Sequence, residues 1–504
     1  MSFRGERESH GIDPGFLYSD FRQPPVTPTI TMQTLKCDLC VIGAGSGGLS
    51  VAAGAAQLDR KVVLIEKGEM GGDCLNTGCV PSKSLIAAAN RAERIREAAG
   101  FGVRAGEPAI DAARVHAHIR EAIETIAPND SQARFEGLGV TVIREPARFL
   151  DERNVEAGSA RIRARRFVIA AGSRPAVPPI PGLEQISYFT NETIFDKDFI
   201  PPHLVVIGAG PIGIELAQAH RRLGAQVTLL EAAKALPKED EEAAALIVGK
   251  LSREGVRLLE GTQATSIART ESGARLQLVS ARGSEVIDGT HILVAAGRKP
   301  NVEGLHLENA GVAYDAKGIK VDSGMKTSNR RVYAIGDIAG GAQFTHLAGY
   351  HASLVIRNAM FRLPVRVDNL TIPRVTFSNP ELAQVGLTER EARLAHREVK
   401  IAHAEFADND RAVTEREREG FIKVVVGRGG AILGATIVGA HAGELILPWV
   451  MAMTRKLPLS ALAGLVVPYP TLSDISRRAA SNHYAPLLFS RSTRLLVKLL
   501  AGLG

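Results

Sequence analysis

The amino-acid sequence predicts an α/β fold, because one strand-helix-strand pattern occurs in it twice. Residues 43–66 (GAGSGGLSVAAGAAQLDRKVVLIE) and residues 208–231 (GAGPIGIELAQAHRRLGAQVTLLE) have the same length and align without gaps. In each copy a Gly-x-Gly-x-x-Gly turn follows a β-like run, leads into an Ala-rich helix and a second apolar strand, and ends on a glutamate. A chain of 504 residues is long enough for about two to four domains. We therefore predict two Rossmann-like domains and at least one further domain.

The three glycines of each turn have separate tasks in binding a dinucleotide. The first permits a tight turn, the second lets a pyrophosphate approach the backbone, and the third lets the helix pack closely on the strand. In chain order these are Gly43, Gly45 and Gly48 in the first copy and Gly208, Gly210 and Gly213 in the second. The helix N-terminus then faces the phosphates with its free N–H groups. Glu66 and Glu231 are expected to accept hydrogen bonds from a ribose diol.

A second pair of similar segments indicates how the two copies are connected. RFVIAAGSRP (residues 166–175) and HILVAAGRKPN (residues 291–301) each predict a buried strand that ends in a glycine turn, at Gly172 and Gly297. Both turns can lie against a dinucleotide. The proline-rich segment after the first predicts a crossing between domains. We therefore expect the second nucleotide-binding domain to be inserted in the first.

The segment GGDCLNTGCVPSK (residues 71–83) places Cys74 and Cys79 close together in a chain that has four cysteines. So few cysteines cannot form a disulfide framework, and a disulfide here is expected to be redox-active. In a regular helix the two Cα atoms would be about 8–9 Å apart, beyond the usual disulfide range. The glycines permit an irregular segment ahead of a helix predicted over residues 81–99. The N-terminus of this helix and the charge of Lys83 both favour thiolate over thiol.

On these motifs the chain resembles the class I pyridine nucleotide-disulfide oxidoreductases, the flavoprotein family of dihydrolipoamide dehydrogenase, glutathione reductase and mercuric reductase. The resemblance covers nearly the whole chain, from about residue 36 to residue 480. It implies FAD in the first nucleotide-binding domain and a nicotinamide dinucleotide in the second. It also implies that Cys74 exchanges with the substrate, that Cys79 lies against the flavin, and that Lys83 pairs with Glu215.

The resemblance implies further cofactor contacts at strand ends and helix starts. For FAD these are Ala147, Gly172, Asp337, Thr345 and His346, beside Gly43, Gly45, Gly48, Glu66 and Lys83. His346 is expected to act mainly through its backbone. For the nicotinamide dinucleotide they are Gly208, Gly210, Gly213, Glu231 and Gly297. The carboxylate of Glu231 repels a 2′-phosphate and favours NAD over NADP. The positive charge of Lys234, three residues further along the chain, weakly favours NADP instead.

The C-terminal region departs from the family pattern at one position. Disulfide-using members end with a His-Pro-Thr-Leu-Ser-Glu motif whose histidine serves as acid and base in the partner's active site. This chain reads YPTLSD, with Tyr469 in place of the histidine and Asp474 in place of the glutamate. A phenol with a pKa of about 10 is ionised to roughly one part in a thousand at pH 7. Tyr469 is therefore expected to donate a proton but to be a poor base, which leaves the substrate open.

The resemblance and the repeats together predict the domain division and a homodimer. The predicted segments are a mobile N-terminal arm over 1–34, an FAD-binding domain over 35–175 and 298–366, an NAD-binding domain over 176–297, an α+β dimerisation domain over 367–485 and an amphipathic tail over 486–504. The homodimer follows because residues 469–474 would complete the other subunit's site.

Composition excludes several other classes of protein. The net charge of +7 comes with scattered arginines and no basic patch interleaved with aromatic residues, so no nucleic acid is expected as a partner. No apolar run is long enough to span a membrane, no metal site is expected, and the few cysteines favour a cytoplasmic location. Cys37 and Cys40 are predicted to be buried, on opposite faces of the first strand. The tail, with Arg491, Arg494 and Lys498 on one helical face, permits weak membrane contact or packing on the protein.

These observations predict an FAD enzyme that passes electrons between a nicotinamide, the flavin and a Cys74–Cys79 disulfide, and then to a small-molecule substrate. The first hypothesis is that the substrate is a disulfide, as in dihydrolipoamide dehydrogenase. A metal thiolate, as in mercuric reductase, or a quinone is the alternative. From another class, a membrane-adherent flavoprotein scaffold or redox sensor also fits the tail.

Overall fold

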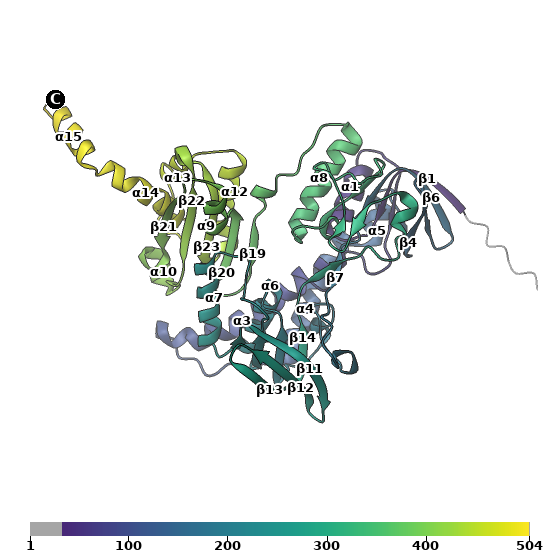
Figure 1. Cartoon of the computed structure of the whole chain (residues 1–504), viewed down its shortest axis with the longest axis horizontal. Coiled ribbons are helices and arrows are strands. Elements are labelled where there is room, and N and C mark those ends of the chain that lie inside the picture. The colour runs from purple at the N-terminus through teal and green to yellow at the C-terminus, as the bar shows by residue number, and fades with distance from the viewer. Residues whose placement is uncertain (1–32, 503–504) are drawn as a thin grey trace, which may run out of the picture.

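The computed structural model describes residues 33–502, which form three bodies in series (Figure 1). The predicted arm lies outside the described residues except for its last two positions, which belong to the first strand, β1 (Gln33–Ile42). Among residues 33–502, no helix has the length and apolarity needed to cross a membrane.

The first body is a sheet built around the first copy of the repeat. Its strand order is β3-β2-β1-β6-β5-β4, with β18 beside β6. Their bounds are β2 (Val62–Ile65), β3 (Thr141–Ile143), β4 (Ala147–Asp151), β5 (Asn154–Ala157), β6 (Ala160–Ile169) and β18 (Val332–Ala334). The strands β1, β2, β3, β6 and β18 are parallel. β2, β18 and the C-terminal parts of β1 (residues 39–42) and β6 (residues 167–169) are buried on both faces, which explains their continuous apolar sequence. Helices α1 (Ser46–Ala56) and α8 (Thr345–Phe361) pack together on one face.

The second body repeats this plan with the second copy. Strands β8 (His203–Ile207), β9 (Gln226–Leu230), β10 (Arg257–Leu259) and β14 (His291–Val294) form a parallel sheet in the order β10-β9-β8-β14. Along β8, Leu204 and Val206 face helices α6 (Pro211–Arg222) and α7 (Glu241–Arg253). Val205 and Ile207 face an antiparallel meander of β11 (Thr262–Thr270), β12 (Gly273–Ser280) and β13 (Gly283–Gly289). The duplicated strand-helix-strand unit is therefore confirmed.

The chain crosses between these two bodies where two short strands pair. β7 (Ser173–Pro175) and β15 (Arg298–Pro300) run antiparallel, at the two positions where crossings were expected. Helices α3 (Cys79–Glu97) and α4 (Ala112–Ile126) belong to the predicted first domain, yet they share a core with α6 of the second (Figure 1). The domain bounds themselves stay a prediction.

The third body is an antiparallel sheet in the order β19-β20-β23-β22-β21, as expected for an α+β C-terminal domain. The strands are β19 (Arg374–Thr376), β20 (Glu381–Gly386), β21 (Lys400–Glu405), β22 (Phe421–Val426) and β23 (Ile432–Gly439). Trp449, on α12 (Leu447–Thr454), is fully buried against β22, β23 and α14 (Asp474–Leu488).

The remaining α-helices of the described chain are α2 (Gly72–Asn76), α5 (Gln132–Gly137), α9 (Glu389–Ala395), α10 (Asp410–Glu415), α11 (Ala442–Leu445), α13 (Leu459–Ala463) and α15 (Arg491–Leu500).

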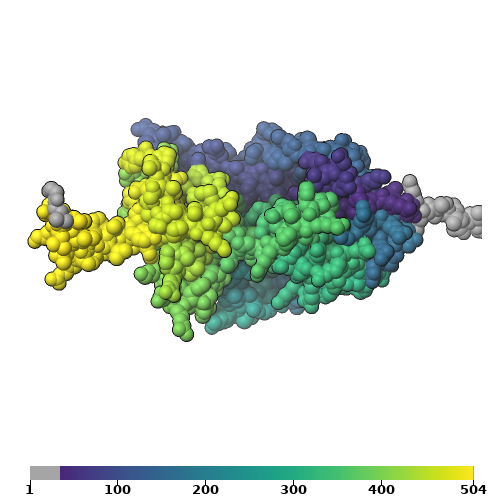
Figure 2. Space-filling model, turned by 90° about the horizontal axis from the view of Figure 1, so that it is seen from above, coloured from purple at the N-terminus to yellow at the C-terminus, as the bar shows by residue number. Residues whose placement is uncertain are grey.

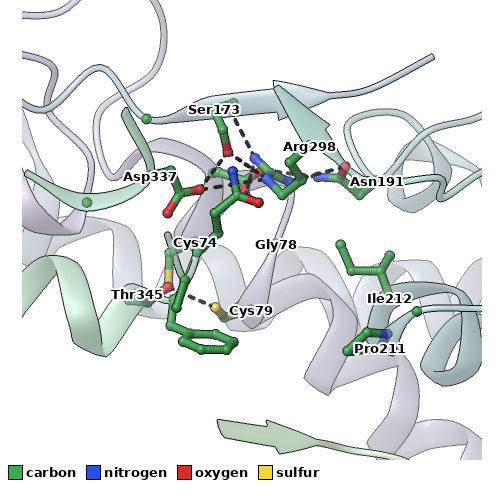
Figure 3. Close-up of a pocket in the computed structure, with 18 of the residues that line it drawn as sticks. Cys74, Gly78, Cys79, Ser173, Asn191, Pro211, Ile212, Arg298, Asp337 and Thr345 are labelled. Carbon is green, nitrogen blue, oxygen red and sulfur yellow. Dashed lines mark hydrogen bonds and ion pairs between the residues drawn. The ribbon is translucent and has the colours of Figure 1, made fainter. Parts of the chain in front are cut away.

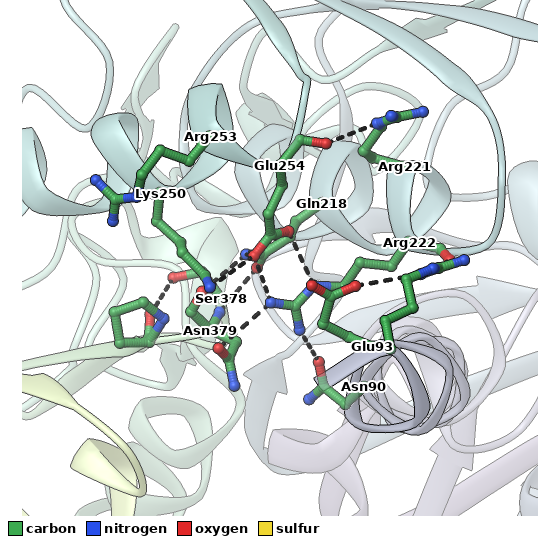
Figure 4. Close-up of polar contacts among 12 residues, drawn as sticks. Asn90, Glu93, Gln218, Arg221, Arg222, Lys250, Arg253, Glu254, Ser378 and Asn379 are labelled. Carbon is green, nitrogen blue, oxygen red and sulfur yellow. Dashed lines mark hydrogen bonds and ion pairs between the residues drawn. The ribbon is translucent and has the colours of Figure 1, made fainter. Parts of the chain in front are cut away.

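A buried polar joint connects α3 with the second and third bodies (Figure 4). Arg222 on α6 donates to Glu254, which follows α7, at 2.6 Å, and to Asn90 on α3 at 2.5 Å. Gln218, one turn earlier on α6, donates to the carbonyl of Asn379 in the third body at 2.8 Å. Lys250 also lies 3.5 Å from Glu254. Because Arg222 and Glu254 are almost fully buried, their charges are balanced chiefly by each other and by these neighbours.

Candidate functional site

A continuous cleft of about 2200 Å³ runs between the bodies and brings most of the predicted site residues together. Both glycine turns, both glutamates, the cysteine pair and the N-terminus of α8 line it. Figure 3 shows its centre, where Cys74 and Cys79 lie below a cluster of polar side chains that includes Asp337 and Arg298.

The two glycine turns have the same geometry. A Cβ on Gly48 or Gly213 would lie 1.8 or 1.9 Å from the carbonyl oxygen of the first glycine in its own turn, so these positions require glycine for packing. At the middle glycine the surroundings are open: a Cβ on Gly45 would meet nothing closer than 3.9 Å, and one on Gly210 nothing within 4 Å. Both of these glycines line the cleft. The open space at the N-termini of α1 and α6 therefore fits a dinucleotide pyrophosphate at each turn.

Glu66 and Glu231 hold their own turns in equivalent ways. Glu66 accepts from the backbone N–H of Ala44 at 2.6 Å, and Glu231 accepts from Ala209 at 2.9 Å. Each glutamate also accepts from a backbone N–H two residues further along the chain. A carboxylate has about four lone-pair positions, so both retain acceptor capacity toward a ribose.

The cysteine pair lies where two helices meet. Cys74 is in the short helix α2, and Cys79 is the first residue of α3. The irregular connection that the sequence predicted is present, because the left-handed backbone of Gly71 (φ 87°) starts α2 and Gly78 separates the two helices. Both cysteines are free thiols in this structure, and Cys79 is exposed to the cleft.

The surroundings of the pair favour a thiolate on one sulfur. A hydrogen bond from Cys74, another from the hydroxyl of Thr345 at 3.2 Å and the charge of Lys83 lower the pKa of Cys79 to about 6. The pKa of Cys74 is raised, because it shares its proton with Cys79 and is partly buried. The pair therefore holds a Cys79 thiolate beside a Cys74 thiol at neutral pH.

The ion pair expected between Lys83 and Glu215 is present. Lys83 Nζ lies 2.9 Å from Glu215 Oε2, across the contact between α3 and α6. The other oxygen of Glu215 accepts from the backbone N–H of Phe377 at 2.8 Å, and the Lys83 ammonium lies 4.3 Å from the centre of the Phe377 ring. One glutamate thus connects the cysteine helix, the second nucleotide fold and the C-terminal body.

A polar cluster above the cysteines contains residues that the sequence analysis missed (Figure 3). Arg298 lies 3.1 Å from Asp73 and 3.8 Å from Asp337, and its Nε donates to Ser173 at 2.7 Å. Ser173 in turn donates to Asp337 at 2.6 Å. Burial raises the pKa of Asp337, partly offset by Ser173 and Arg298. The similar segments GSRP and GRKP contain Ser173 and Arg298, so their pairing was the available signal.

The remaining predicted FAD contacts occupy the cleft wall. Ala147 starts β4, and Gly172 follows β6 in a left-handed turn (φ 65°), where an added Cβ would have no atom within 4 Å. Gly297 is the equivalent turn after β14 (φ 118°). His346 directs Nε2 to the carbonyl of Pro373 at 2.8 Å, in keeping with a backbone role at the start of α8.

Tyr469 and Asp474 each form their side-chain hydrogen bond with a different residue. Tyr469 is 76% exposed, and its hydroxyl donates to Asp410 at 2.6 Å. This hydrogen bond raises the pKa of Tyr469. Asp474 instead accepts from Arg477 at 2.7 Å. Asp410, 59 residues before Tyr469, is thus a partner that the sequence analysis did not identify.

The second cysteine pair takes no part in the cleft. Cys37 and Cys40 are both buried in β1, as predicted, and burial raises the pKa of both thiols. The expected separation on opposite faces is wrong, because both side chains belong to one buried cluster. Within the part of the chain that the structure describes, no group of His, Cys, Asp and Glu side chains is arranged to hold a metal ion.

Comparison with known proteins agrees with the geometry. Residues 37–352 match the pyridine nucleotide-disulphide oxidoreductase family, and residues 372–480 match its dimerisation domain. A dihydrolipoyl dehydrogenase of Thermus scotoductus is 38% identical over 88% of this chain and 96% of its own length. A mercuric reductase of Streptomyces lividans is 33% identical over 88% of this chain and 95% of its own length.

Two solved structures have the same architecture. LpdA from Mycobacterium tuberculosis superimposes with a TM-score of 0.82 at 26% identity, covering 89% of this chain and 100% of that one. The Cu(II) complex of the HOCl-induced flavoprotein disulfide reductase RclA from Escherichia coli gives 0.80 at 26% identity, covering 89% of this chain and 99% of that one. The dimerisation domain supports a homodimer. The chain therefore belongs to the pyridine nucleotide-disulphide oxidoreductase family, as an FAD-dependent enzyme that uses NAD(P).

Proposed function

We propose that the protein uses NADH to reduce a small disulfide of the lipoamide type through Cys74 and Cys79, with Tyr469 as a proton donor. The observation that carries this proposal is the Cys79 sulfur held beside Thr345 and Lys83 in a cleft that also contains both nucleotide turns. When bound, FAD supplies hydride acceptance from a nicotinamide and electron transfer to a disulfide.

The chain's own residues divide between the two nucleotides. Around Gly43, Gly45, Gly48 and Glu66, with Ala147, Gly172, Asp337 and the start of α8 at Thr345 and His346, the cleft would hold FAD. The turn of Gly208, Gly210 and Gly213, with Glu231 and Gly297, would hold the nicotinamide dinucleotide. The carboxylate of Glu231 is fixed by two backbone N–H groups, and it would repel a 2′-phosphate, which favours NAD(H) over NADP(H).

The thiol chemistry follows from the unequal sulfurs. The Cys74 sulfur attacks one sulfur of the substrate disulfide and expels a substrate thiolate, which takes up the proton that Cys74 loses. The Cys79 thiolate then attacks the Cys74 sulfur, closes the Cys74–Cys79 disulfide and expels the second substrate thiolate. This second thiolate needs one proton from outside the pair. In the homodimer, Tyr469 of the other subunit would supply it.

Anaerobic titration of the purified holoprotein with NADH and NADPH tests the relay. We expect a long-wavelength absorption band from a thiolate beside the flavin, developed at a lower concentration of NADH than of NADPH. Cys79→Ser should abolish the band, whereas Cys74→Ser, the matched control, should keep it because the Cys79 thiolate remains. A band that survives in Cys79→Ser would refute the assignment of the two sulfurs.

The phenol of Tyr469 leads to a separate prediction about the direction of the reaction. The hydrogen bond to Asp410 raises its pKa, so Tyr469 cannot serve as a base at neutral pH, and oxidation of a neutral dithiol should be slow. Tyr469→His supplies a group that titrates near neutral pH, and we expect turnover with dihydrolipoamide to rise about tenfold or more. Tyr469→Phe is the control and should give no rise. Equal turnover in the three proteins would show that this position handles no proton.

Metal-ion reduction is the second candidate function, and the same phenol favours it. Reduction of a metal ion bound by thiolates needs no proton base. A tyrosine in place of the histidine therefore does not slow that reaction. Related proteins include mercuric reductases and the flavoprotein disulfide reductase RclA, whose structure was solved as a Cu(II) complex. Comparing NADH oxidation with lipoamide, Hg²⁺, Cu²⁺ and a quinone under matched conditions separates the two candidates.

A further inference from the structure

The C-terminal tail, defined here as residues 487–500, extends away from the body of the protein. Figure 1 shows it leaving the third body at the end opposite β1, and Figure 2 shows the same projection from a view turned by 90°. Its helix, α15 (Arg491–Leu500), starts at Ser490, whose side chain accepts from the backbone N–H of Thr493 at 3.2 Å. The match to the dimerisation domain ends at residue 480, so the tail lies beyond the shared domain.

The tail carries a group of apolar side chains that the other described residues leave exposed. Its large apolar side chains are each more than half exposed, and α15 has no buried residue. They are Leu487, Leu488, Phe489, Leu495, Leu496, Val497, Leu499 and Leu500. Exposed apolar side chains gathered in one segment indicate a surface that docks on something.

The opposite side of α15 is basic. Arg491, Arg494 and Lys498 are spaced three and four residues apart, which places them on one helical face. None of the three forms an ion pair with another described residue of the chain, and residues 475–504 contain no aspartate or glutamate. A strongly amphipathic helix with a purely basic polar face is typical of helices that lie in an anionic lipid interface.

We propose that α15 docks on an anionic membrane surface, with its leucines inserted at the headgroup level and its basic face in contact with lipid phosphates. A second copy of the tail is a poorer occupant, because it would bring like charges together and offers no acid to pair with them. A Lys or Arg near an anionic membrane contributes about 1 kcal/mol to binding, so three of them contribute roughly a hundredfold in affinity. This inference does not depend on which substrate the enzyme reduces.

Co-sedimentation of the full-length holoprotein with vesicles tests the proposal. We expect binding to phosphatidylcholine vesicles that contain phosphatidylglycerol, weak binding to pure phosphatidylcholine, and a loss of binding as salt rises. Neutralising the basic face (Arg491→Gln, Arg494→Gln and Lys498→Gln together) should weaken binding roughly a hundredfold. Leu496→Glu with Leu500→Glu should abolish it. Neutralising three exposed basic residues elsewhere (Arg269→Gln, Arg282→Gln and Lys317→Gln) is the matched control and should leave binding unchanged.

Two results would overturn the proposal. One is equal binding of the control and tail variants to the anionic vesicles, which would make the contact non-specific. The other is a change of oligomeric mass in the Leu496→Glu, Leu500→Glu protein together with no vesicle binding by the unmodified chain, which would assign the apolar face to a second copy. NADH titration of each variant measures the reaction at the catalytic cleft independently of membrane binding. A loss of vesicle binding can therefore be distinguished from a loss of the proposed function.

Discussion

The hydroxyl of Thr345 is one of three groups that stabilise the Cys79 thiolate, and it acts from a different helix. Thr345→Val removes this hydrogen bond and keeps the side-chain shape. We expect the pKa of Cys79 to rise by about one pH unit, the value of one hydrogen bond to a charged group. The thiolate fraction at pH 7 should fall, because a pKa near 6 leaves the sulfur mostly ionised there and a pKa near 7 leaves it half ionised. The pH dependence of alkylation at Cys79 by iodoacetamide, measured in the reduced holoprotein, checks this.

Ser353→Ala is the control for this substitution, since Ser353 lies on the same helix and its hydroxyl donates to the local carbonyl of Tyr350. An unchanged alkylation profile in Thr345→Val would mean that Cys74 and Lys83 suffice to hold the thiolate.

Individual site residues could be predicted from the sequence where they belong to a local motif. The cysteines, the glycines and the Lys83–Glu215 pair follow from motif positions, and the structure contains that ion pair. Asp410 and Asp73 were missed as partners of Tyr469 and Arg298, because these contacts join segments 59 and 225 positions apart in the chain. Such contacts depend on side-chain placement between domains, which no local pattern specifies.

Among the helices, α3 and α6 carry two polar contacts seven residues apart. Lys83 pairs with Glu215, and two turns later Asn90 accepts from Arg222, which is also bound to Glu254 (Figure 4). The same spacing on both helices keeps these pairs on the facing sides of the contact. The joint around Arg222 therefore fixes the helices that place Lys83.

Glu254→Gln should weaken this joint severely. The side chains of Arg222 and Glu254 are only 2% and 7% exposed, so the substitution leaves a buried guanidinium without its countercharge. Removing one partner of a buried pair typically costs about 3–5 kcal/mol. Urea unfolding of the holoprotein measures the loss. Glu124→Gln is the control, because it breaks an exposed ion pair: the side chain of Arg120 is 65% exposed and that of Glu124 is 68% exposed. It should change the free energy of unfolding by less than about 1 kcal/mol. Similar losses in both variants would show that the joint is not buried in solution.

Element positions followed from the sequence where apolar runs and glycine turns coincide. The strands and helices of both nucleotide folds are where the repeat predicted them. The helix expected over 81–99 begins earlier, at Cys79, because Gly78 separates it from the short helix α2. The packing of α3 and α4 on the second body was not predictable, because their apolar faces alone do not say which sheet they cover.

At the scale of the whole molecule, one structural unit occurs twice in one chain, and we expect that each copy can be inactivated separately. The middle glycines Gly45 and Gly210 line the cleft, and an added Cβ at either position meets no atom of the protein at close range. Alanine there should therefore leave the fold intact and obstruct only the nucleotide.

We expect Gly45→Ala to be purified with a reduced FAD content, whereas Gly210→Ala should retain FAD and raise KM for NADH about tenfold, which corresponds to about 1.4 kcal/mol. Flavin absorbance per polypeptide and steady-state kinetics with NADH measure the two effects. Gly106→Ala, at an exposed position with nothing within 4 Å of the new Cβ, is the matched control and should change neither. Loss of FAD from both variants would mean that the two turns serve one shared site. Separate losses would mean that the duplicated fold supplies two nucleotide sites on either side of the Lys83–Glu215 contact.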